Sequence, residues 1–494
     1  MPCRARRLPA PEPPGYYRRR PEETVLYEAL RAHLASFLER CDESGPEAVL
    51  PAHVRGELQR FLTCGILAHG FVRVRCPTCR DDLLVAFSCR GRGFCPSCGG
   101  RRMADTAARW SDRVLPKVPW RQWVLSLPFP LRFRLAWDPE LLSEVLAVFQ
   151  SAIAMRLRAK ARRRGLRGAR HASVTVIQRF GGALNLNVHV HSLVADGVWV
   201  MGASGPRFEP LRVDEEDVRW VVGRVWRQSL RLLRGRGMLR DEEEDGDQDE
   251  LLPESRQLEL RLMDCSVQGR IAMGVNAGQR VRAEGRRLRR RHDMPRTRRR
   301  MQAFLDGFDL QAAVRIPASD RRRLEHVSRY FLRPAIATER LELLDNGVYR
   351  YELKRPWSDG TEAFLFEPLE LMEKLAALVP IPRANLVRYH GILAPASAWR
   401  AAVVPSPDDE SSPAHCGAGR PPVPTDRVPW AWLLRRVFLV EVLRCARCGG
   451  RRQIIGPVTE PGAIPRILRH LGIPATPPRL DPARAPPEFD SWAS

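Results

Sequence analysis

The sequence predicts an α+β fold, in which a small cysteine-based domain precedes an antiparallel sheet with helices packed on it. Two runs rich in β-branched residues, 173–180 and 186–195, flank a turn with Gly181 and Gly182, which is typical of a hairpin. Segments with apolar residues at helical spacing alternate with such runs, as in other α+β chains. Two Cys-x-x-Cys motifs precede them in the chain.

Composition favours a nucleic-acid partner. The chain has 494 residues and a formal net charge of +24, and lysine occurs only at positions 117, 160, 354 and 374. Nearly all the positive charge is therefore arginine, whose planar guanidinium matches phosphate oxygens in a bidentate way. A GC-rich genome would also raise the arginine content, whatever the function.

The chain lacks the signals of export and membrane insertion. No apolar run is long enough to span a bilayer, and the N-terminus has no apolar signal-peptide core. We therefore expect a cytoplasmic protein without a membrane partner. In that compartment thiols stay reduced, so the 12 cysteines indicate metal binding rather than disulfides.

The first 60 residues read as a helical region. Leucines recur at a spacing of four from Leu26 to Leu38, which predicts a helix over residues 23–41, and a second helix is expected over residues 52–64. Neither segment carries evident chemistry, so both are interpreted as packing elements.

Residues 61–105 are predicted to form a zinc ribbon. Two Cys-x-x-Cys knuckles are separated by a short β-hairpin, and each supplies two thiolates to tetrahedral zinc from one tight turn. The expected ligands of a structural Zn²⁺ are Cys76, Cys79, Cys95 and Cys98. Cys64 and Cys89 are spare, and Cys89 is an alternative to one of the four.

Residues 106–380 are predicted to form the sheet domain. A buried strand over residues 121–127 and a long helix over residues 139–164 lead into the hairpin, and together they suggest an antiparallel sheet covered on one face by helices. Another helix is expected over residues 213–234, followed by a flexible insert at about residues 236–300 that carries an acidic run and then many arginines.

Three further segments complete the sheet domain. A strand at residues 308–316 precedes a helix that Ser319 caps and that extends to about Leu332, with Tyr330 beside its apolar stripe. Two strands over residues 347–354 and 362–366 follow. A tyrosine at such a border is either a core residue with its hydroxyl at the surface or a nucleophile.

Residues 381–494 are read as a basic C-terminal region with a Pro-rich tail. It contains one more pair, Cys445-Ala-Arg-Cys448, which is half of a zinc site. We expect a second zinc knuckle there, closed by distant ligands such as Cys416 or His415, or a pair that binds no metal.

The second strand of the hairpin carries His189 and His191. Strand residues alternate between faces, so both imidazoles point the same way. Two imidazoles on one strand face can hold a divalent metal if a neighbouring element supplies a third ligand. The alternative is a pair of hydrogen-bonded histidines on the face of the sheet.

Six motifs in the same order resemble the insertion-sequence-91 group of rolling-circle transposases, over residues 25 to 472 or so. They are Phe-Ser-Cys-Arg-Gly-Arg-Gly-Phe-Cys-Pro-Ser-Cys-Gly-Gly-Arg-Arg-Met-Ala (87–104), Gln-Trp-Val-Leu-Ser-Leu-Pro-Phe (122–129), Leu-Asn-Leu-Asn-Val-His-Val-His (184–191), Tyr-Phe-Leu-Arg-Pro (330–334), Leu-Lys-Arg-Pro-Trp-Ser-Asp-Gly-Thr (353–361) and Leu-Val-Arg-Tyr-His-Gly-Ile-Leu-Ala-Pro (386–395). This group combines a zinc-ribbon DNA-binding domain with an HUH single-strand endonuclease.

The resemblance implies a nicking reaction on single-stranded DNA at element ends and targets, in a bacterial cytoplasm in association with the nucleoid. Tyr330 would attack the scissile phosphate and leave a 5′-phosphotyrosine, while Mg²⁺ or Mn²⁺ on His189 and His191 polarises a phosphate oxygen. The third ligand is predicted to be Gln178, which the hairpin brings across from His189, with Asp196 as the second choice.

The sequence departs from some members of this group, which carry two tyrosines one helical turn apart. Here the earlier position is His326, so Tyr330 stands alone, and the second strand transfer needs the 3′-OH itself or a second protomer. Self-association is therefore a further expectation. Tyr349 and Tyr351 are weaker rivals as nucleophiles. The alternative function is a decayed copy that binds DNA without cutting it.

Overall fold

The computed structural model describes residues 18–43, 49–239, 256–285, 300–405 and 442–484. The chain divides into two compact units. The smaller comprises residues 1–23, 63–89 and 413–478, and the larger comprises residues 24–62, 90–412 and 479–494. The smaller unit thus joins a segment before the sheet domain to one after it, whereas the sequence had suggested a separate C-terminal region.

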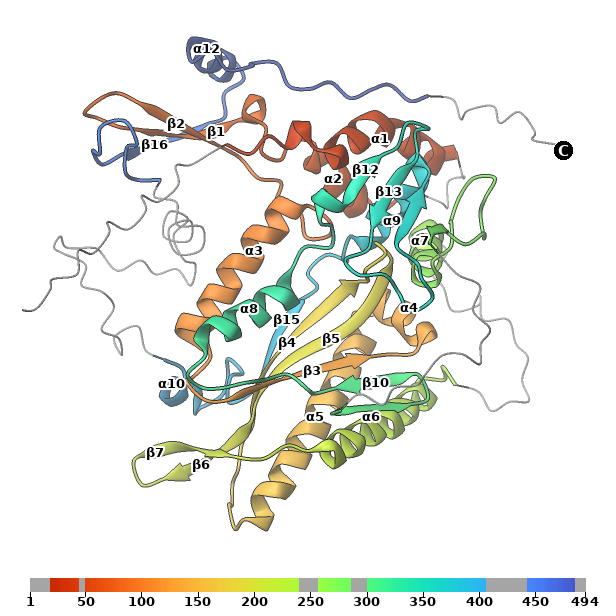
Figure 1. Ribbon diagram of the computed structural model, residues 1–494, viewed down its shortest axis with the longest axis vertical. Helices are drawn as coiled ribbons and strands as arrows, with labels where there is room; N and C mark the ends of the chain where they lie inside the picture. Colours follow the sequence, from red (N-terminus) through yellow and green to blue (C-terminus); the bar gives the residue numbers. More distant parts are fainter. Residues whose placement is uncertain (1–17, 44–48, 240–255, 286–299, 406–441, 485–494) are drawn as a thin grey trace, which may run out of the picture. The chain divides into compact units, whose positions relative to one another are not determined.

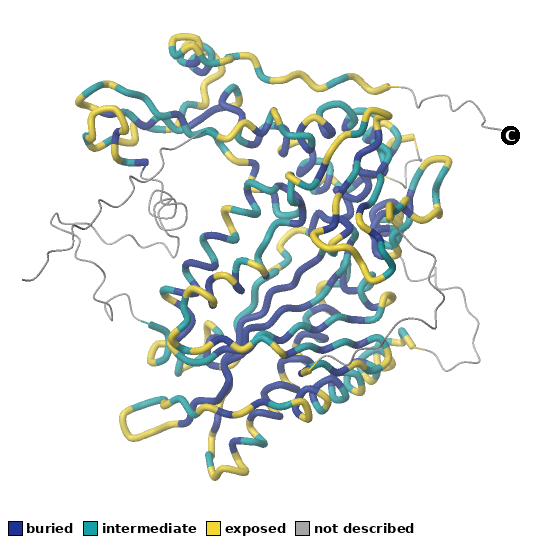
Figure 2. Tube along the Cα trace, viewed as in Figure 1, coloured by how far each residue is buried: buried dark blue, intermediate teal, exposed yellow. Residues whose placement is uncertain are grey.

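The larger unit is built on a seven-stranded antiparallel sheet with the order β15-β4-β5-β3-β10-β9, in which β11 also pairs with β3 (Figure 1). The strands are β3 (Trp120–Ser126), β4 (Ala172–Phe180), β5 (Leu186–Ala195), β9 (Gln302–Leu305), β10 (Phe308–Gln311), β11 (Arg315–Ile316) and β15 (Val387–Gly391). The predicted hairpin is the β4–β5 pair, at the centre of the sheet and buried along most of its length (Figure 2).

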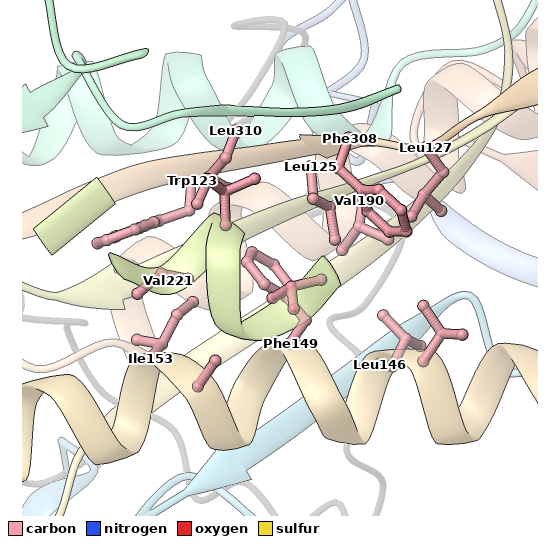
Figure 3. Close-up of a cluster of buried hydrophobic side chains, with 14 of the residues drawn as sticks. Trp123, Leu125, Leu127, Leu146, Phe149, Ile153, Val190, Val221, Phe308 and Leu310 are labelled. Atoms are coloured by element: carbon pink, nitrogen blue, oxygen red, sulfur yellow. The ribbon is translucent and has the colours of Figure 1, made fainter. Parts of the chain in front are cut away.

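One face of this sheet packs on α4 (Phe129–Trp137), α5 (Pro139–Arg163) and α6 (Glu215–Gly235). Figure 3 shows Leu125 of β3, Val190 of β5 and Phe149 of α5 among the buried side chains between these layers. Burial of this many apolar side chains is the main source of stability for the sheet. The prediction of an α+β fold is confirmed.

Helices cover the other face as well, contrary to the expectation of one covered face. Leu324 and Phe331 of α8 (Arg321–Leu332) pack with Val174 and Leu193 of the central strands in a second apolar cluster. The central strands are therefore apolar on both faces, a pattern that buried sheets share. The face under α8 is the one on which His189 and His191 lie, because Leu193 continues their alternation.

Acidic residues begin the main helices. Asp138 accepts hydrogen bonds from the backbone N–H groups of Glu140 (3.0 Å) and Leu141 (2.8 Å) at the start of α5. Asp320, rather than the predicted Ser319, is the N-cap of α8, and its carboxylate accepts from the N–H of Arg323 at 2.9 Å. A carboxylate at this position is also attracted by the positive end of the helix dipole because it is negatively charged, whereas a hydroxyl is neutral.

The larger unit also contains α9 (Pro368–Leu378), which is buried from Glu370 to Leu378. Its other elements are α1 (Val25–Glu43), α2 (Ala52–Phe61), α3 (Pro96–Arg109), the π-helical turn η3 (Trp110–Val114), β6 (Gly197–Gly202), β7 (Gly205–Pro210), α7 (Gln257–Gln268), η6 (Thr338–Arg340), α10 (Arg400–Val403) and the sheet of β12 (Leu341–Leu343), β13 (Tyr349–Glu352), β14 (Ala363–Phe366) and β8 (Arg282–Glu284). The two N-terminal helices and the strand pair after α8 were predicted. α3 was not, because its residues were assigned to the ribbon.

The smaller unit contains a three-stranded sheet with the order β16-β1-β2. Its elements are η2 (Leu67–His69), β1 (Phe71–Arg75), β2 (Asp82–Ala86), β16 (Gln453–Val458) and α12 (Ala463–His470). Its apolar cluster has five buried members, Leu67, Phe71, Leu84, Ile464 and Leu468. So small a core contributes little stability by itself.

Some predicted features fall outside the described residues, among them Cys416, His415, the acidic run and most of the arginine-rich part of the insert. Within the described ranges, no helix is long and apolar enough to cross a membrane.

Candidate nicking centre

The two histidines of β5 lie side by side on the face covered by α8. The centroids of the His189 and His191 rings are 4.9 Å apart. Gln178 of β4 is the register partner of His189, and directly paired residues of antiparallel strands point to the same face. The hairpin therefore places Gln178 beside the first histidine, as the sequence predicted for its position.

Both imidazoles are held neutral. Burial is the largest cause that lowers the pKa of His189 to about 4, and it lowers the pKa of His191 well below its usual value, with a smaller contribution from the charge of Arg333. The Nδ1 of His189 lies 2.9 Å from the carbonyl oxygen of Asn187. Donation to that carbonyl leaves the Nε2 lone pair available, which is the arrangement that metal-binding histidines adopt.

Four polar atoms on this face are buried without a hydrogen-bond partner in the described part of the chain. They are both ring nitrogens of His191, Oε1 of Gln178 and Oδ1 of Asn187. Unsatisfied buried polar groups are costly, and a set of them calls for an explanation. Imidazole nitrogens with amide oxygens form a donor set that suits a divalent cation.

Gln178 is held in a defined orientation. Its side chain is 3% exposed, and its Nε2 donates to the carbonyl oxygen of Phe331 at 3.0 Å. This bond links β4 to the end of α8, and it leaves Oε1 without a hydrogen-bond partner in the described part of the chain. Asp196, the second choice for a ligand, is placed differently, because its carboxylate is paired with Arg121 and Arg315 at 2.8 Å each.

Tyr330 reaches this face from the last turn of α8. Its ring centroid is 6.0 Å from that of His191, with the ring planes at 89°, and 43% of the residue is exposed. The adjacent Phe331 is buried and stacks on His191 at 4.8 Å. Phe331 thus fixes the end of the helix against the sheet, while Tyr330 presents its phenol to solvent beside the histidines.

Arg333 is a functional candidate that the sequence reasoning missed, although it lies in the Tyr-Phe-Leu-Arg-Pro motif. Its guanidinium carbon lies 4.7 Å from the centroid of the Tyr330 ring and 5.5 Å from that of Phe180. A guanidinium held between two rings is well placed to pair with a phosphate or a phenolate.

A cavity of about 740 Å³ opens on the exposed side of Tyr330. The cationic side chains in its wall are Arg333, Arg340, Lys354 and Arg355, and Trp357 and Phe180 supply aromatic surface. Positive charge interleaved with aromatic rings is the composition of sites that bind single-stranded nucleic acid. The same wall contains one acidic residue, Glu339.

The rival tyrosines lie on β13, in the sheet of β12, β13, β14 and β8, and both are buried. Tyr349 and Tyr351 are 2% and 1% exposed. Burial raises the pKa of Tyr349 to about 12, and the Tyr351 hydroxyl accepts a hydrogen bond from Arg340 at 2.7 Å. Neither is presented as a nucleophile. His326 is exposed one turn before Tyr330 on α8, where the two share a helix face.

The ten cysteines within the described ranges include two groups of four that could hold a metal. In each group all sulfur atoms lie within 4.8 Å of one another. One group is Cys64, Cys89, Cys95 and Cys98, and the other is Cys76, Cys79, Cys445 and Cys448. The predicted quartet is therefore split between them, because the knuckle at Cys76 pairs with the distant one at Cys445 and the spare thiols join Cys95 and Cys98.

Two family models match the chain. The model described as "Putative transposase" matches residues 172–400, and the model described as "Transposase zinc-binding domain", of the insertion-sequence-91 type, matches residues 29–127. The chain is an insertion-sequence-91-like transposase with an N-terminal zinc-binding domain. No curated protein and no solved structure shows significant similarity to it.

The matches confirm the resemblance and place it on the structure. The transposase match contains β4, β5 and α8, and so every group of the candidate nicking centre. The partner of this transposase is DNA, in agreement with its net charge of +24. The zinc-binding match, together with the two groups of four thiols, supports structural Zn²⁺.

Proposed function

We propose that this transposase nicks and rejoins single-stranded DNA through a covalent 5′-phosphotyrosine at Tyr330, in rolling-circle transposition by the HUH type of chemistry. One observation carries the proposal. An exposed phenol stands 6.0 Å, centroid to centroid, from a buried histidine whose two nitrogens have no partner in the described part of the chain. That histidine belongs to a face of nitrogen and oxygen acceptors.

The acceptor set fits a divalent cation such as Mg²⁺ or Mn²⁺. Nε2 of His189, a ring nitrogen of His191 and Oε1 of Gln178 would hold it. The hydrogen bond of His189 Nδ1 to Asn187 directs the lone pair of its Nε2 away from that carbonyl, and the atoms of His191 and Gln178 have no hydrogen-bond partner in the described part of the chain. A cation bound there would supply positive charge that polarises a non-bridging oxygen of the scissile phosphate.

In the nicking step the Tyr330 oxygen attacks phosphorus. The new bond joins tyrosine oxygen to phosphorus, the bond from phosphorus to the 3′ oxygen breaks, and the phenolic proton is lost to solvent while the 3′ oxygen gains one as a hydroxyl. Arg333 contributes a fixed positive charge 4.7 Å from the ring. That charge stabilises the negative charge of both the attacking phenolate and the phosphate oxygens.

Rejoining is the same step in reverse. A 3′-OH attacks the phosphotyrosine, and the phosphorus–tyrosine bond is replaced by a phosphodiester bond, so no nucleotide cofactor is consumed. Tyr330 is the only tyrosine on α8, which allows one covalent end per protomer. Holding two ends covalently at once then needs a second copy of the chain.

A covalent-adduct assay tests the proposal. The full-length chain is incubated with single-stranded oligonucleotides from the element ends, with Mg²⁺ or Mn²⁺, and the products are separated under denaturing conditions. We expect a protein–DNA adduct that maps to Tyr330 by mass spectrometry and is lost in Tyr330→Phe. Tyr349→Phe is the matched control and should keep the adduct.

Double-stranded oligonucleotides of the same sequence test whether the reaction is specific for single-stranded DNA. They should give little adduct. Tight binding of the oligonucleotides with no adduct under any metal condition would contradict the proposal. It would instead identify a decayed copy that only binds DNA.

A further inference from the structure

We propose that the knuckles at Cys76 and Cys445 form one Cys₄ zinc site, so that the zinc ribbon of the smaller unit is assembled from two segments far apart in the chain. Its two halves are the β1–β2 hairpin and the segment that leads through Cys445 and Cys448 into β16. The zinc-binding family match ends at residue 127 and therefore contains only the first half.

The sulfur atoms are placed as a tetrahedral site requires. The Sγ atoms of Cys76 and Cys448 are 3.5 Å apart, as are those of Cys79 and Cys445, and all four lie within 4.8 Å of one another. Tetrahedral zinc with bonds of about 2.3 Å to sulfur separates its ligands by about 3.8 Å. The cross-pairing matters, because each close contact joins one thiol from each segment.

The two knuckles have the same backbone conformation. The N–H of the first cysteine donates to the carbonyl five residues later, from Cys76 to Asp81 (2.9 Å) and from Cys445 to Gly450 (2.8 Å). The carbonyl of the first cysteine accepts from the residue four positions later, Arg80 or Gly449, at 2.9 Å in both. Matching turns that face each other are what a ribbon needs to deliver two thiolates from each side.

The fourth residue after the first cysteine has a positive φ in both knuckles, 62° at Arg80 and 72° at Gly449. A non-glycine residue in this region is uncommon. Arg80 therefore adopts a costly conformation that reproduces the turn that glycine forms freely in the other half. The shared turn is evidence that the first knuckle is shaped for its partner.

The strands beyond the knuckles join the halves. β16 pairs antiparallel with β1 from Phe71 opposite Val458 to Arg75 opposite Gln453. The carboxylate of Asp81 in the first knuckle is paired with Arg452 of the second segment, whose side chain is 9% exposed. This pairing neutralises the nearest carboxylate, so the four thiols are the ligands that remain.

Gly450 leaves room for the thiols. A Cβ atom at this position would lie 3.2 Å from the sulfur of Cys448 and 3.4 Å from that of Cys76. A larger residue would crowd two of the four ligands. The close approach of the backbone to the thiols therefore favours glycine here.

The assembly has a consequence for the C-terminal segment. The cluster around Leu468 is small, and in small domains the free energy of zinc binding is a large part of the free energy of folding. Zinc therefore holds β16 on β1, and removal of the metal should release the C-terminal half of the ribbon.

Zinc content of the full-length chain tests the site. The chain is purified under reducing conditions and its zinc is measured by elemental mass spectrometry. The double variant Cys445→Ser/Cys448→Ser should contain one zinc equivalent less than the wild-type chain. Cys265→Ser, which changes a thiol outside both groups, should leave the zinc content unchanged.

Two further measurements keep the test decisive if the double variant folds poorly. Cys448→His preserves a zinc-binding side chain, so this variant should keep the zinc equivalent that the double variant loses. When its zinc is replaced by cobalt, Cys448→His should show less thiolate-to-cobalt charge-transfer absorption than the cobalt-substituted wild-type chain, because one thiolate ligand is gone. In hydrogen exchange, a chelator should speed exchange of the β16 amides tenfold or more, while the β5 amides are unaffected.

An unchanged zinc content in Cys445→Ser/Cys448→Ser would overturn the proposal. So would a wild-type chain whose four thiols become titratable only after a disulfide reductant and without metal loss, because the two close sulfur pairs would then be disulfides.

Discussion

The candidate nicking centre and the split zinc ribbon are built in opposite ways. In the centre, both histidines and Gln178 come from one hairpin, and only Tyr330 and Arg333 come from elsewhere. In the ribbon, the paired thiols are 372 positions apart for Cys76 and Cys448. Loop closure over such a length costs more entropy than a hairpin does, although the cost grows only slowly with length.

The two regions also differ in what stabilises them. The hairpin of the centre lies between two apolar clusters, one on each face of the seven-stranded sheet. The apolar cluster of the ribbon has only five buried members in the described part of the chain. We infer that the centre is preorganised by packing before any metal binds, whereas the ribbon depends on its metal for its structure.

Removal of the histidines should have the largest effect and tests the first half of this comparison. His189→Ala or His191→Ala should lower the rate of adduct formation roughly 10³-fold, about 4 kcal/mol in the activation free energy, since the charge on the phosphate is lost. The melting temperature should stay close to that of wild type, because the packing remains. A rate within a few-fold of wild type, measured at saturating Mn²⁺, would exclude His189 and His191 from the reaction.

The same contrast explains what the sequence could predict. Alternation along β5 placed His189 and His191 on one face, and the hairpin that contains Gly181 and Gly182 placed Gln178 across from the first. These are consequences of local strand geometry, so they can be read from nearby residues. The α5 and α6 helices followed from apolar spacing for the same reason.

The cysteine grouping could not be read in that way. The knuckle at Cys76 has two candidate partners of identical spacing, at Cys95 and at Cys445, and spacing alone favours the nearer one. The deciding contacts are the long-range pairing of β16 with β1 and the helix α3, which begins at Pro96 directly after Cys95. Arg333 was missed for a similar reason, because its position over Tyr330 depends on the chain direction after α8.

Replacement of Arg333 should have the next largest effect. Arg333→Ala removes the charge beside the phenol and should slow adduct formation about 10²-fold, which corresponds to about 2.7 kcal/mol. Arg333→Lys keeps the charge but loses the planar stacking, so it should recover part of the rate. Single-turnover kinetics at saturating DNA separates this effect from weaker binding.

The matched control for this prediction is Arg329→Ala. Arg329 lies on the same helix, and its guanidinium pairs with Glu325 at 2.6 Å. If both alanine variants slowed the reaction equally, the effect would report on the charge of α8 as a whole and not on a phosphate contact of Arg333.

A pair of core substitutions tests the second half of the comparison. Leu468→Ala in the ribbon and Leu125→Ala in the sheet each remove a buried leucine, a change that typically costs 2–5 kcal/mol. For Leu468→Ala, a destabilisation of about 2 kcal/mol should reduce the zinc affinity more than tenfold, because zinc binding and folding of the ribbon are coupled. Competition with a chelator measures this loss. Leu125→Ala should lower the melting temperature and leave zinc retention unchanged, and equal zinc loss in both variants would show that the two regions fold together.

The smallest expected effect concerns acid. Burial is the main cause that lowers the pKa of His171 to about 3, and the charge of Arg158 adds to it. Above pH 6.5 the imidazole is neutral in both states, but below that value only the unfolded chain takes up the proton. Stability should therefore fall as the pH decreases from about 6.5, by at most about 1.4 kcal/mol per unit from this group.

His171→Asn removes this titration and should flatten the decline of the melting temperature between pH 6.5 and pH 5, whereas the zinc content measured in the same samples should fall as in the wild-type chain. Acid acts on the ribbon through protonation of thiolate ligands and on the sheet through a buried imidazole. The variant separates the two, because it changes only the sheet. Burial also lowers the pKa of His189, His191 and His390 in the same sheet. A decline of the melting temperature that keeps its slope would therefore show that His171 does not contribute, and would leave these histidines and the thiolates of the ribbon as the source of the acid sensitivity.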